Sequence, residues 1–394
     1  MDVDPDSRYR AKAPLSPSPL LFLERFLRSR SITRNDYSVA CICPMGIELA
    51  PVEALLDEIH TLPPLGVDPL RPRLRRSDQP GYTTGRIGGY NIVVAAMPRI
   101  GNNISAAVTT QLLSDFPFVE FCFLVGIGGG IPSHNDDDDV RLGDVVVSQP
   151  SGVSGGVIQY DLGKRTAYGS FERTGTSVRP PTILSANVER LKSLHRREGS
   201  RISQFLTQML EKFPTMAKDY ARPAINEDQL FDTTYPHQGG PTCRNCDPSQ
   251  IVVRKQRTCS DPQIHYGIIG SANVVMKDSL TRDALKRDLG IICVDMEAAG
   301  LMDTFPGLVI RGICDYADSH KHKNWQPYAA AVAAAYLKEL LMIIPRNEIA
   351  EQRGEFFLID STEDRLHLLL PLPFSESLND SSLSCKKYFT SFPN

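Results

Sequence analysis

Acidic side chains follow two strand-like apolar runs in the stretch VDMEAAGLMDTFPGLVIRGICDYADSH, residues 294–320. Asp295 and Glu297 end the first run, and Asp315 and Asp318 end the second. A carboxylate at a strand end can accept hydrogen bonds from a ribose diol, whereas a buried carboxyl group can stay protonated and act as an acid. Cleavage of an N-glycosidic bond needs both parts, because the sugar becomes an oxocarbenium-like cation while the leaving base takes up a proton.

A structural alternative exists for the same carboxyl groups. Asp315 and Asp318 could cap the turn that follows their strand, and Glu297 could pair with Arg311 or another basic residue. Spacing alone does not separate these two interpretations.

Glycines gather at the end of another apolar run, in VGIGGG, residues 125–130. Glycines at a strand end let a ligand approach backbone N–H groups closely, and they can form an anion-binding nest. The stretch does not fit a dinucleotide fingerprint or a Walker loop, because it lacks the G-x-G-x-x-G spacing and the Lys-Ser/Thr pair.

The elements that must position these groups alternate between strands and helices. This pattern predicts an α/β protein, with a mixed central sheet covered by helices on both faces and ligands beyond the strand ends. The expected strands are 37–45, a hairpin over 85–103, 119–132, 140–150, 155–163, 264–276, 291–297 and 307–317. The expected helices are 47–60, 103–116, 180–200, 279–290, 298–305 and 326–344.

Composition divides the chain into three parts. We expect an N-terminal extension over 1–35, a domain over 36–345 with a polar, Pro-rich insertion at about 200–262, and a C-terminal linker or tail over 346–394. The chain has 394 residues, a formal net charge of -3 and nine cysteines without a disulfide-like framework. These features predict a cytoplasmic protein without an overall basic field for nucleic acid and without a membrane span.

The motifs VGIGGG, VRLGDVVVSQP, YGIIGSANVVM, VDMEAAG and IRGICDYADSH occur in this order. With them the chain resembles the nucleoside phosphorylase and nucleosidase superfamily, over roughly residues 37–345. It looks most like the fungal branch found as the N-terminal domain of NLR-type immune proteins. The resemblance implies a three-layer α/β/α phosphorylase-like fold, no cofactor, a small purine nucleoside or nucleotide as partner, and a homo-oligomer.

The resemblance also implies roles for individual residues. Met296 and Glu297 match the ribose clamp, and Asp315 matches the acid that protonates the purine at N7. The remaining substrate-binding positions implied by the match are Gly126, Gly128, Gly129, Gly101, Asn102, Asn273 and Val274, with Arg99 beside them.

Three positions depart from, or only loosely match, the superfamily pattern. Val274 stands where nucleosidases stack the base on an aromatic ring, so another aromatic residue is needed, and Trp325 is a candidate unless it packs at a helix start. Leu124 replaces the phosphate-binding Arg of bacterial phosphorylases, which favours water as the acceptor. Glu48 is the nearest match to the catalytic base, with Glu53 as the alternative.

The function predicted from these residues is hydrolytic release of adenine from ATP or an adenosine-type substrate, as in ATP-nucleosidase immune effectors. A phosphate-dependent purine phosphorylase and a non-catalytic nucleotide-sensing module remain the alternatives. Basic residues near the expected site strands could meet a polyphosphate: Arg86, Arg99, Arg141, Arg173, Lys164 and Lys277.

The expected insertion contains CRNC, Cys243 to Cys246. Together with Cys259 and either His237 or His265, this pair could hold zinc as a structural clip. The pattern lacks a second C-x-x-C and its flanks are irregular, so zinc is the less favoured interpretation of this segment. No metal is expected among the site residues.

Overall fold

The computed structural model describes residues 32–62, 81–133, 139–167, 171–175, 178–224, 227–321 and 323–345. Its helices and strands all lie in the unit that ends at Ile344. The expected N-terminal extension over 1–35, apart from its last four residues, and the expected tail over 346–394 lie outside the described residues.

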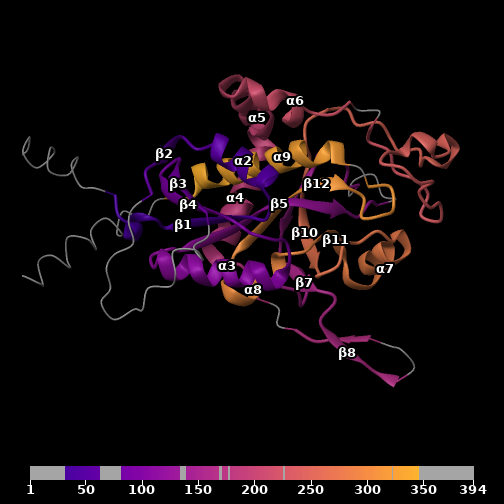
Figure 1. The fold of residues 1–394 in the computed structure, drawn as a ribbon, viewed down its shortest axis with the longest axis horizontal. Coiled ribbons are helices and arrows are strands. Elements are labelled where there is room, and N and C mark those ends of the chain that lie inside the picture. Colours follow the sequence, from indigo (N-terminus) through magenta and orange to yellow (C-terminus); the bar gives the residue numbers. More distant parts are fainter. Residues whose placement is uncertain are drawn as a thin grey trace, which may run out of the picture. The chain divides into compact units, whose positions relative to one another are not determined.

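A 10-stranded mixed sheet forms the centre of this unit, with the strand order β11-β10-β6-β12-β5-β1-β4-β3-β2 and with β7 beside β10 (Figure 1). The strands are β1 (Val39–Cys43), β2 (Glu58–His60), β3 (Tyr82–Ile87), β4 (Tyr90–Ala96), β5 (Phe121–Gly130), β6 (Val145–Ser148), β7 (Val157–Gln159), β10 (Ile264–Ser271), β11 (Ile291–Asp295) and β12 (Leu308–Asp315). A separate hairpin consists of β8 (Gly163–Arg165) and β9 (Phe171–Arg173).

The helices cover both faces of the sheet, as the alternating pattern predicted. They are α2 (Gly46–Ala54), α3 (Asn102–Asp115), α4 (Thr182–Glu198), α5 (Ile202–Lys212), α6 (Ala217–Tyr220), α7 (Ser279–Leu289), α8 (Ala298–Thr304) and α9 (Gln326–Ile343). Short 3-10 helices span Arg34–Asp36, Pro214–Met216, Cys243–Asn245, Pro248–Gln250 and Lys323–Trp325. α2 and α9 pack together on one face, and α3 and α8 pack together on the other (Figure 1).

The long strand β5 closes part of the sheet on itself. It pairs in parallel with β1 and β12, and its last residues pair antiparallel with β11. β11 returns through β10 and β6 to β12, so these five strands form a closed circuit. The core inside and around the sheet is made by β-branched and small apolar residues, such as the fully buried run Val39–Cys43.

The structure corrects two sequence-based expectations about elements. The helix expected over 47–60 stops at Ala54, and Glu58–His60 forms β2 instead, because these residues pair antiparallel with β3. The expected insertion also begins with a helix that contributes to the core: α5 buries Ile202, Phe205, Leu206 and Met209 and contacts α9.

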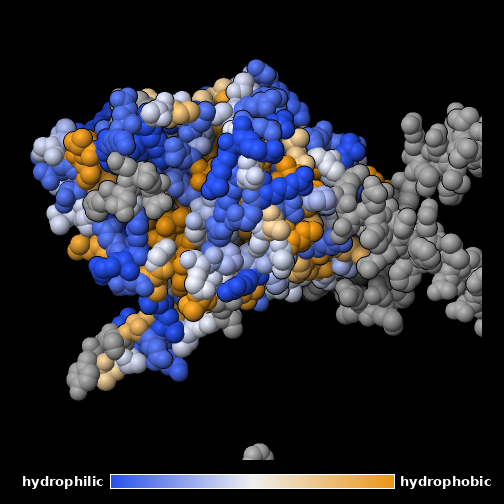
Figure 2. All heavy atoms as spheres, turned by 180° about the vertical axis from the view of Figure 1, so that it is seen from behind, coloured by the Kyte–Doolittle hydropathy of each residue, from blue (hydrophilic) through white to orange (hydrophobic). Residues whose placement is uncertain are grey.

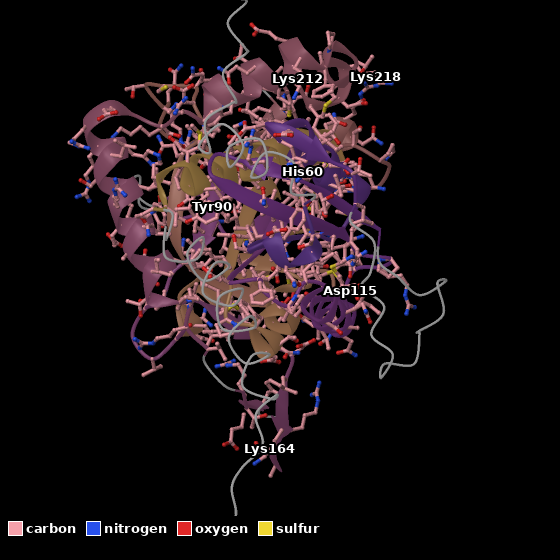
Figure 3. All side chains as sticks on the ribbon, turned by 90° about the vertical axis from the view of Figure 1, so that its left-hand side faces the viewer. His60, Tyr90, Asp115, Lys164, Lys212 and Lys218 are labelled. Atoms are coloured by element: carbon pink, nitrogen blue, oxygen red, sulfur yellow. The ribbon has the colours of Figure 1, made fainter. Side chains whose placement is uncertain are left out.

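The outer surface mixes polar and apolar side chains on the face seen in Figure 2. The β8–β9 hairpin carries Lys164, which lies at the far end of the molecule from Lys212 and Lys218 (Figure 3). No helix among the described residues is both long enough and apolar enough to cross a membrane.

Candidate active site

The ends of three strands meet where the sequence predicted a site. β12 pairs with β5 so that Arg311 lies opposite Gly126 and Asp315 lies opposite Gly129, with a register shift between Ile313 and Asp315. On the other side of β5, Val294 of β11 lies opposite the same Gly129. A register shift of this kind changes the direction of the following side chains, as β-bulges do beside many active sites. Residues from distant parts of the sequence therefore converge on the glycines of β5.

Arg311 is the centre of this convergence. Its guanidinium is fully buried and meets three carboxyl groups: Asp295 Oδ2 at 2.7 Å, Glu297 Oε2 at 3.0 Å and Glu48 Oε1 at 3.8 Å. Burial alone would lower the pKa of Arg311, but the neighbouring carboxylates, above all that of Asp295, raise it above its usual value. One cation thus organises three buried acids.

Glu48 lies in the first turn of α2 and is buried, with 1% of its surface exposed. Its Oε1 accepts a hydrogen bond from the Ile127 backbone N–H at 2.7 Å, whereas its buried Oε2 has no hydrogen-bond partner among the described residues. Burial raises the pKa of Glu48 to about 8, against the opposing effect of Arg311. A carboxyl group with a pKa near neutrality and a free oxygen can bind and deprotonate a water molecule.

Glu297 is buried at the N-terminus of α8, directly after β11. Its Oε2 accepts from Arg311, and its Oε1 accepts from the Gly101 backbone N–H at 3.2 Å. Burial raises the pKa of Glu297, and the charge of Arg311 opposes that shift. Each of its oxygens keeps a second lone pair that a hydroxyl group could use.

The expected Gly101–Asn102 turn lies beside Glu297. The Asn102 backbone N–H donates to Asn273 Oδ1 at 3.0 Å, and the Asn102 side-chain oxygen accepts from Ser271 Oγ and from the Gly300 N–H, both at 3.0 Å. These bonds tie the start of α3 to β10 and α8. The structure therefore brings Gly101, Asn102, Asn273 and Glu297 together.

Asp315 ends β12, and its side chain has three contacts. Oδ1 accepts from the Ala317 backbone N–H at 2.8 Å and lies 2.9 Å from Lys321 Nζ, while Oδ2 accepts from the Cys314 thiol at 3.3 Å. Asp315 therefore caps the turn after its strand, as the structural alternative predicted. Its carboxyl group nevertheless also lies beside Gly129. Ala317 has a φ of 54°, a left-handed conformation that is costly for a residue with a Cβ.

Gly126, Gly128 and Gly129 lie within β5, inside the strand expected over 119–132. A Cβ on Gly126 would lie 2.3 Å from Glu48 Oε1 and 2.5 Å from Arg311 Nη1, and a Cβ on Gly129 would lie 2.9 Å from Asp315 Oδ1. A side chain at either position would displace an acidic group of the site. Gly126 and Gly129 therefore matter here because they leave space for the acidic side chains, and less because of the backbone conformations open to glycine.

Several other expected residues have environments that the sequence did not reveal. Val274 is 54% exposed, Arg99 is exposed and Met296 is half-buried. Trp325 is fully buried and packs edge-on against Tyr328, with ring centroids 6.0 Å apart. Of the two interpretations of Trp325, packing at a helix start is therefore the correct one, and stacking on a ligand is not.

Two of the basic residues considered for a polyphosphate are already paired. Arg86 lies 2.8 Å from Glu58, and Arg141 lies 2.7 Å from Asp139. Arg173 and Lys164 lie on the exposed β8–β9 hairpin.

Sequence reasoning considered Arg311 only as a possible partner of Glu297, and the structure shows that pair at 3.0 Å. It missed the central place of Arg311, the role of Asp295 as a partner of Arg311, and Lys321 beside Asp315. Arg311 had a detectable signal, because a lone Arg inside the apolar run LVIRGIC must be buried and must then be paired. Lys321 had none, because it lies in a polar loop.

Comparisons with known proteins identify relatives of this chain. No protein-family model matches the chain. A nucleotide-binding leucine-rich repeat (NLR)-like protein of Hyaloscypha variabilis is 41% identical over 333 residues, which cover 84% of this chain and 32% of that protein. A 5'-methylthioadenosine/S-adenosylhomocysteine nucleosidase of Mycobacterium tuberculosis is 22% identical over 282 residues, which cover 67% of this chain and 85% of the nucleosidase. The resemblance to the nucleoside phosphorylase and nucleosidase superfamily is confirmed.

This chain spans about a third of the length of the NLR-like relative. Two solved nucleosidase structures align with most of this chain. The 5'-methylthioadenosine/S-adenosylhomocysteine nucleosidase of Neisseria meningitidis, in complex with methylthio-immucillin-A, has a TM-score of 0.47 and 16% identity and covers 77% of this chain and 98% of its own. The corresponding nucleosidase of S. pneumoniae has a TM-score of 0.48 and 17% identity, with 78% and 99% covered.

Proposed function

We propose that this protein hydrolyses the N-glycosidic bond of a purine nucleoside or nucleotide, with release of adenine from ATP or an adenosine-type substrate as the preferred reaction. The observation that carries the proposal is the environment of Glu48. Its buried Oε2 has no hydrogen-bond partner among the described residues, and its Oε1 lies beside the guanidinium that also holds Glu297. A water molecule bound to Oε2 would lie next to the proposed ribose site.

Each acidic group has a distinct task in this reaction. Glu297 binds the ribose hydroxyls with the lone pairs that Arg311 and Gly101 leave free. Asp315 supplies a proton or a strong hydrogen bond to N7 of the purine, and Glu48 deprotonates the attacking water. The C1′–N9 bond breaks as the sugar becomes cationic, the base leaves with the proton, and the hydroxide oxygen binds C1′.

Lys321 restricts which oxygen of Asp315 can face the purine, because its Nζ lies 2.9 Å from Asp315 Oδ1. Oδ2, whose neighbour is the Cys314 thiol, is the oxygen that remains for the purine. An acid that donates through Oδ2 does not require Lys321 to move. We therefore place the purine on the Cys314 side of Asp315.

Water is preferred over phosphate as the acceptor because of Leu124. This residue is fully buried in β5 between β1 and β12, and it offers no positive charge to a phosphate ion. Burying a phosphate dianion without a cation partner would be strongly unfavourable. Of the site cations described above, Arg311 already has three carboxyl partners, and Lys321 is paired with Asp315.

Two observations support a nucleotide as well as a nucleoside. Arg99 is exposed two residues before Gly101, and Lys277 is exposed four residues after Asn273, so both lie in segments that contribute to the ribose side. In addition, the relative at 41% identity is named as a nucleotide-binding NLR-like protein. We propose that this chain acts as the nucleotide-consuming effector part of such an immune protein, as a homo-oligomer in the cytoplasm.

Chromatography of reaction products tests the proposal. Purified protein is incubated with ATP, adenosine, inosine or uridine, each with and without phosphate. Free adenine from ATP or adenosine in the absence of phosphate is the expected result. A strict phosphate requirement would make the protein a phosphorylase, and binding of ATP without any free base would favour the nucleotide-sensing alternative.

A further inference from the structure

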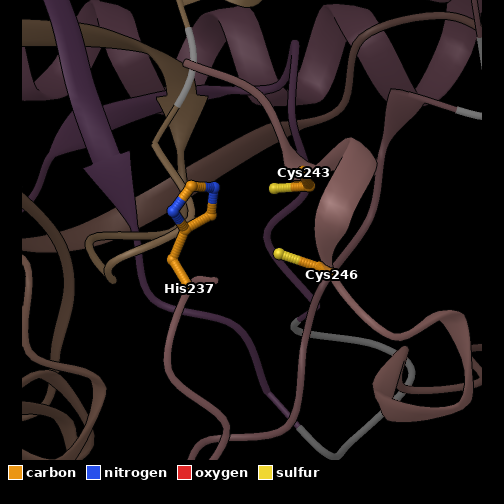
Figure 4. A group of neighbouring side chains, drawn as sticks. All are labelled: His237, Cys243 and Cys246. Carbon is orange, nitrogen blue, oxygen red and sulfur yellow. The ribbon is translucent and has the colours of Figure 1, made fainter. Parts of the chain in front are cut away.

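Three potential metal ligands converge in the segment after α6, away from the acidic cluster. One nitrogen of His237 and the two sulfurs of Cys243 and Cys246 all lie within 4.8 Å of one another (Figure 4). Cys243 is the first residue of the 3-10 helix Cys243–Asn245 and Cys246 directly follows it, so the single turn brings both thiols to the same side. Of the partners considered from sequence, His237 joins them, whereas His265 bonds Asp144 at 2.9 Å and Cys259 is exposed.

We propose that His237, Cys243 and Cys246 bind a structural zinc ion, with His320 as the fourth ligand. Two thiolates and two imidazoles are a typical tetrahedral zinc set, with Zn–S bonds of about 2.3 Å and Zn–N bonds of about 2.0 Å. Such bonds place neighbouring sulfurs about 3.8 Å apart, so the ligand atoms of His237, Cys243 and Cys246, already within 4.8 Å of one another, need to move by only about 1 Å. His320 lies outside this group of three and would have to approach further. The ion would displace one proton from each thiol.

His320 offers a buried ring nitrogen for the fourth position. It is 8% exposed, and its Nε2 has no hydrogen-bond partner among the described residues. Its Nδ1 lies 3.9 Å from the Asp318 carboxylate, which favours a proton on Nδ1 and leaves the lone pair on Nε2. Its ring meets that of His237 edge-on, with centroids 5.5 Å apart, and its carbonyl oxygen lies 3.9 Å from Cys243 Sγ.

Metal binding requires one proton to move on His237. At present its Nδ1 accepts from the Gly239 N–H at 3.1 Å, and its Nε2 donates to the Thr242 carbonyl at 3.2 Å. A metal on Nε2 needs the proton on Nδ1, so the Gly239 N–H must turn away. Gly239 and Gly240 both have positive φ angles, of 84° and 83°, and such a glycine pair can reorient at low cost.

The proposed zinc would clip this segment to the loop that follows the candidate acid. The His237 backbone N–H already donates to Ser319 Oγ at 3.1 Å, and Phe231 stacks on His320 with centroids 4.2 Å apart. Lys321, the next residue along the chain, contacts Asp315. The ion would therefore hold Lys321 against Asp315. The catalytic importance of this contact rests on the proposed function, but the metal site itself is independent of that function.

Metal analysis of the full chain tests the site directly. Untagged protein is produced with added zinc, passed over a chelating resin and measured by plasma mass spectrometry. We expect about one zinc ion per chain. Cys243→Ser and Cys246→Ser should lose it, His320→Asn should bind zinc about tenfold or more weakly, and Cys259→Ser, the matched exposed cysteine, should retain it.

Two results would overturn the site. One is wild-type protein without zinc after this treatment, whether its two thiols are free or joined in a disulfide that lowers the mass by two hydrogens. The other is Cys243→Ser protein that holds as much zinc as Cys259→Ser protein.

Cobalt binding gives a second readout that needs no variant. Wild-type protein loaded with Co²⁺ should show the d–d absorption of a tetrahedral thiolate complex, and an octahedral spectrum would contradict the ligand set. Adenine release is measured separately. If a variant that has lost zinc is also about tenfold less active, the proposed effect of zinc on the Lys321–Asp315 contact is supported. If it keeps full activity, that effect is contradicted but the zinc site is not.

Discussion

Arg311 Nη1 lies 3.8 Å from Glu48 Oε1 in the interior of the protein, while the same guanidinium contacts Asp295 and Glu297. Replacing Arg311 with Met would leave three buried carboxyl groups without a cation. We expect Arg311→Met to lower the free energy of unfolding by about 3–5 kcal/mol, measured by urea denaturation.

Arg311→Lys separates charge from geometry. Lys keeps the charge but has no planar fork to meet Asp295 and Glu297 together, so the loss of stability should be intermediate. An Arg311→Met protein as stable as wild type would contradict the central place given to this cation.

The pKa of Glu48 predicts how stability depends on pH. Burial raises this pKa from 4.5 to about 8, so between these values the folded state keeps a proton that the unfolded state releases. The stabilisation is complete below about pH 4.5 and is lost as pH rises through about 8, by roughly 3 to 5 kcal/mol. Glu48→Gln removes the titration, so its stability relative to wild type should improve from about pH 5 to pH 8 in urea denaturation.

The same group should appear in the kinetics. If Glu48 is the base, kcat/KM for adenine release should rise with pH through the pKa of the free protein, near 8. Parallel stability curves for wild type and Glu48→Gln between pH 5 and 8 would show that Glu48 is ionised in the folded state over this range and would contradict its raised pKa.

Ala317 tests whether the turn after Asp315 is strained. Its φ of 54° costs a residue with a Cβ about 1–2 kcal/mol, and its methyl group is fully buried, which is worth about 0.8 kcal/mol. The free energy of unfolding of Ala317→Gly should therefore lie within about 1 kcal/mol of the wild-type value. Ala317→Val should lose about 2–4 kcal/mol, because a β-branched residue disfavours this conformation and would crowd Gly129. Equal thermal stability of the Val variant and wild type would refute the strain.

Arg99 and Lys277 test the preference for a nucleotide. Removing a cation that contacts a phosphate should raise KM for ATP and leave KM for adenosine unchanged. We expect roughly a tenfold rise for ATP in the Arg99→Ala, Lys277→Ala double variant. Lys164→Ala, on the β8–β9 hairpin, is the matched control and should behave as wild type. Equal effects on both substrates would place the two residues outside a phosphate site.

Much of the fold and part of the site could be predicted from sequence. Alternating apolar runs gave the order of strands and helices, since each run is long enough to show its own period. Asp315 and Glu297 could be found because a parallel sheet presents ligands at its strand ends. Glu58–His60 could not be placed, because its strand character depends on pairing with β3, a contact remote in sequence.

The closure of the sheet through β5 and β11 was equally hidden. It depends on the antiparallel pairing of Cys293 with Gly130, which no local pattern encodes. The shared role of Arg311 depends on the same closure, because β11 carries Asp295 to the guanidinium. The part of the site that sequence reasoning missed thus depends on contacts between strands that are far apart in the sequence.

The most direct test of the account is adenine release from ATP in phosphate-free buffer by wild-type protein and by Asp315→Asn, followed by chromatography. Asn keeps the shape of the side chain but cannot donate a proton as an acid. The account predicts free adenine from wild type and a rate lower by about 10²–10⁴-fold in the variant, with the protein still folded. Adenine release at the wild-type rate by Asp315→Asn, or none by either protein, would contradict it.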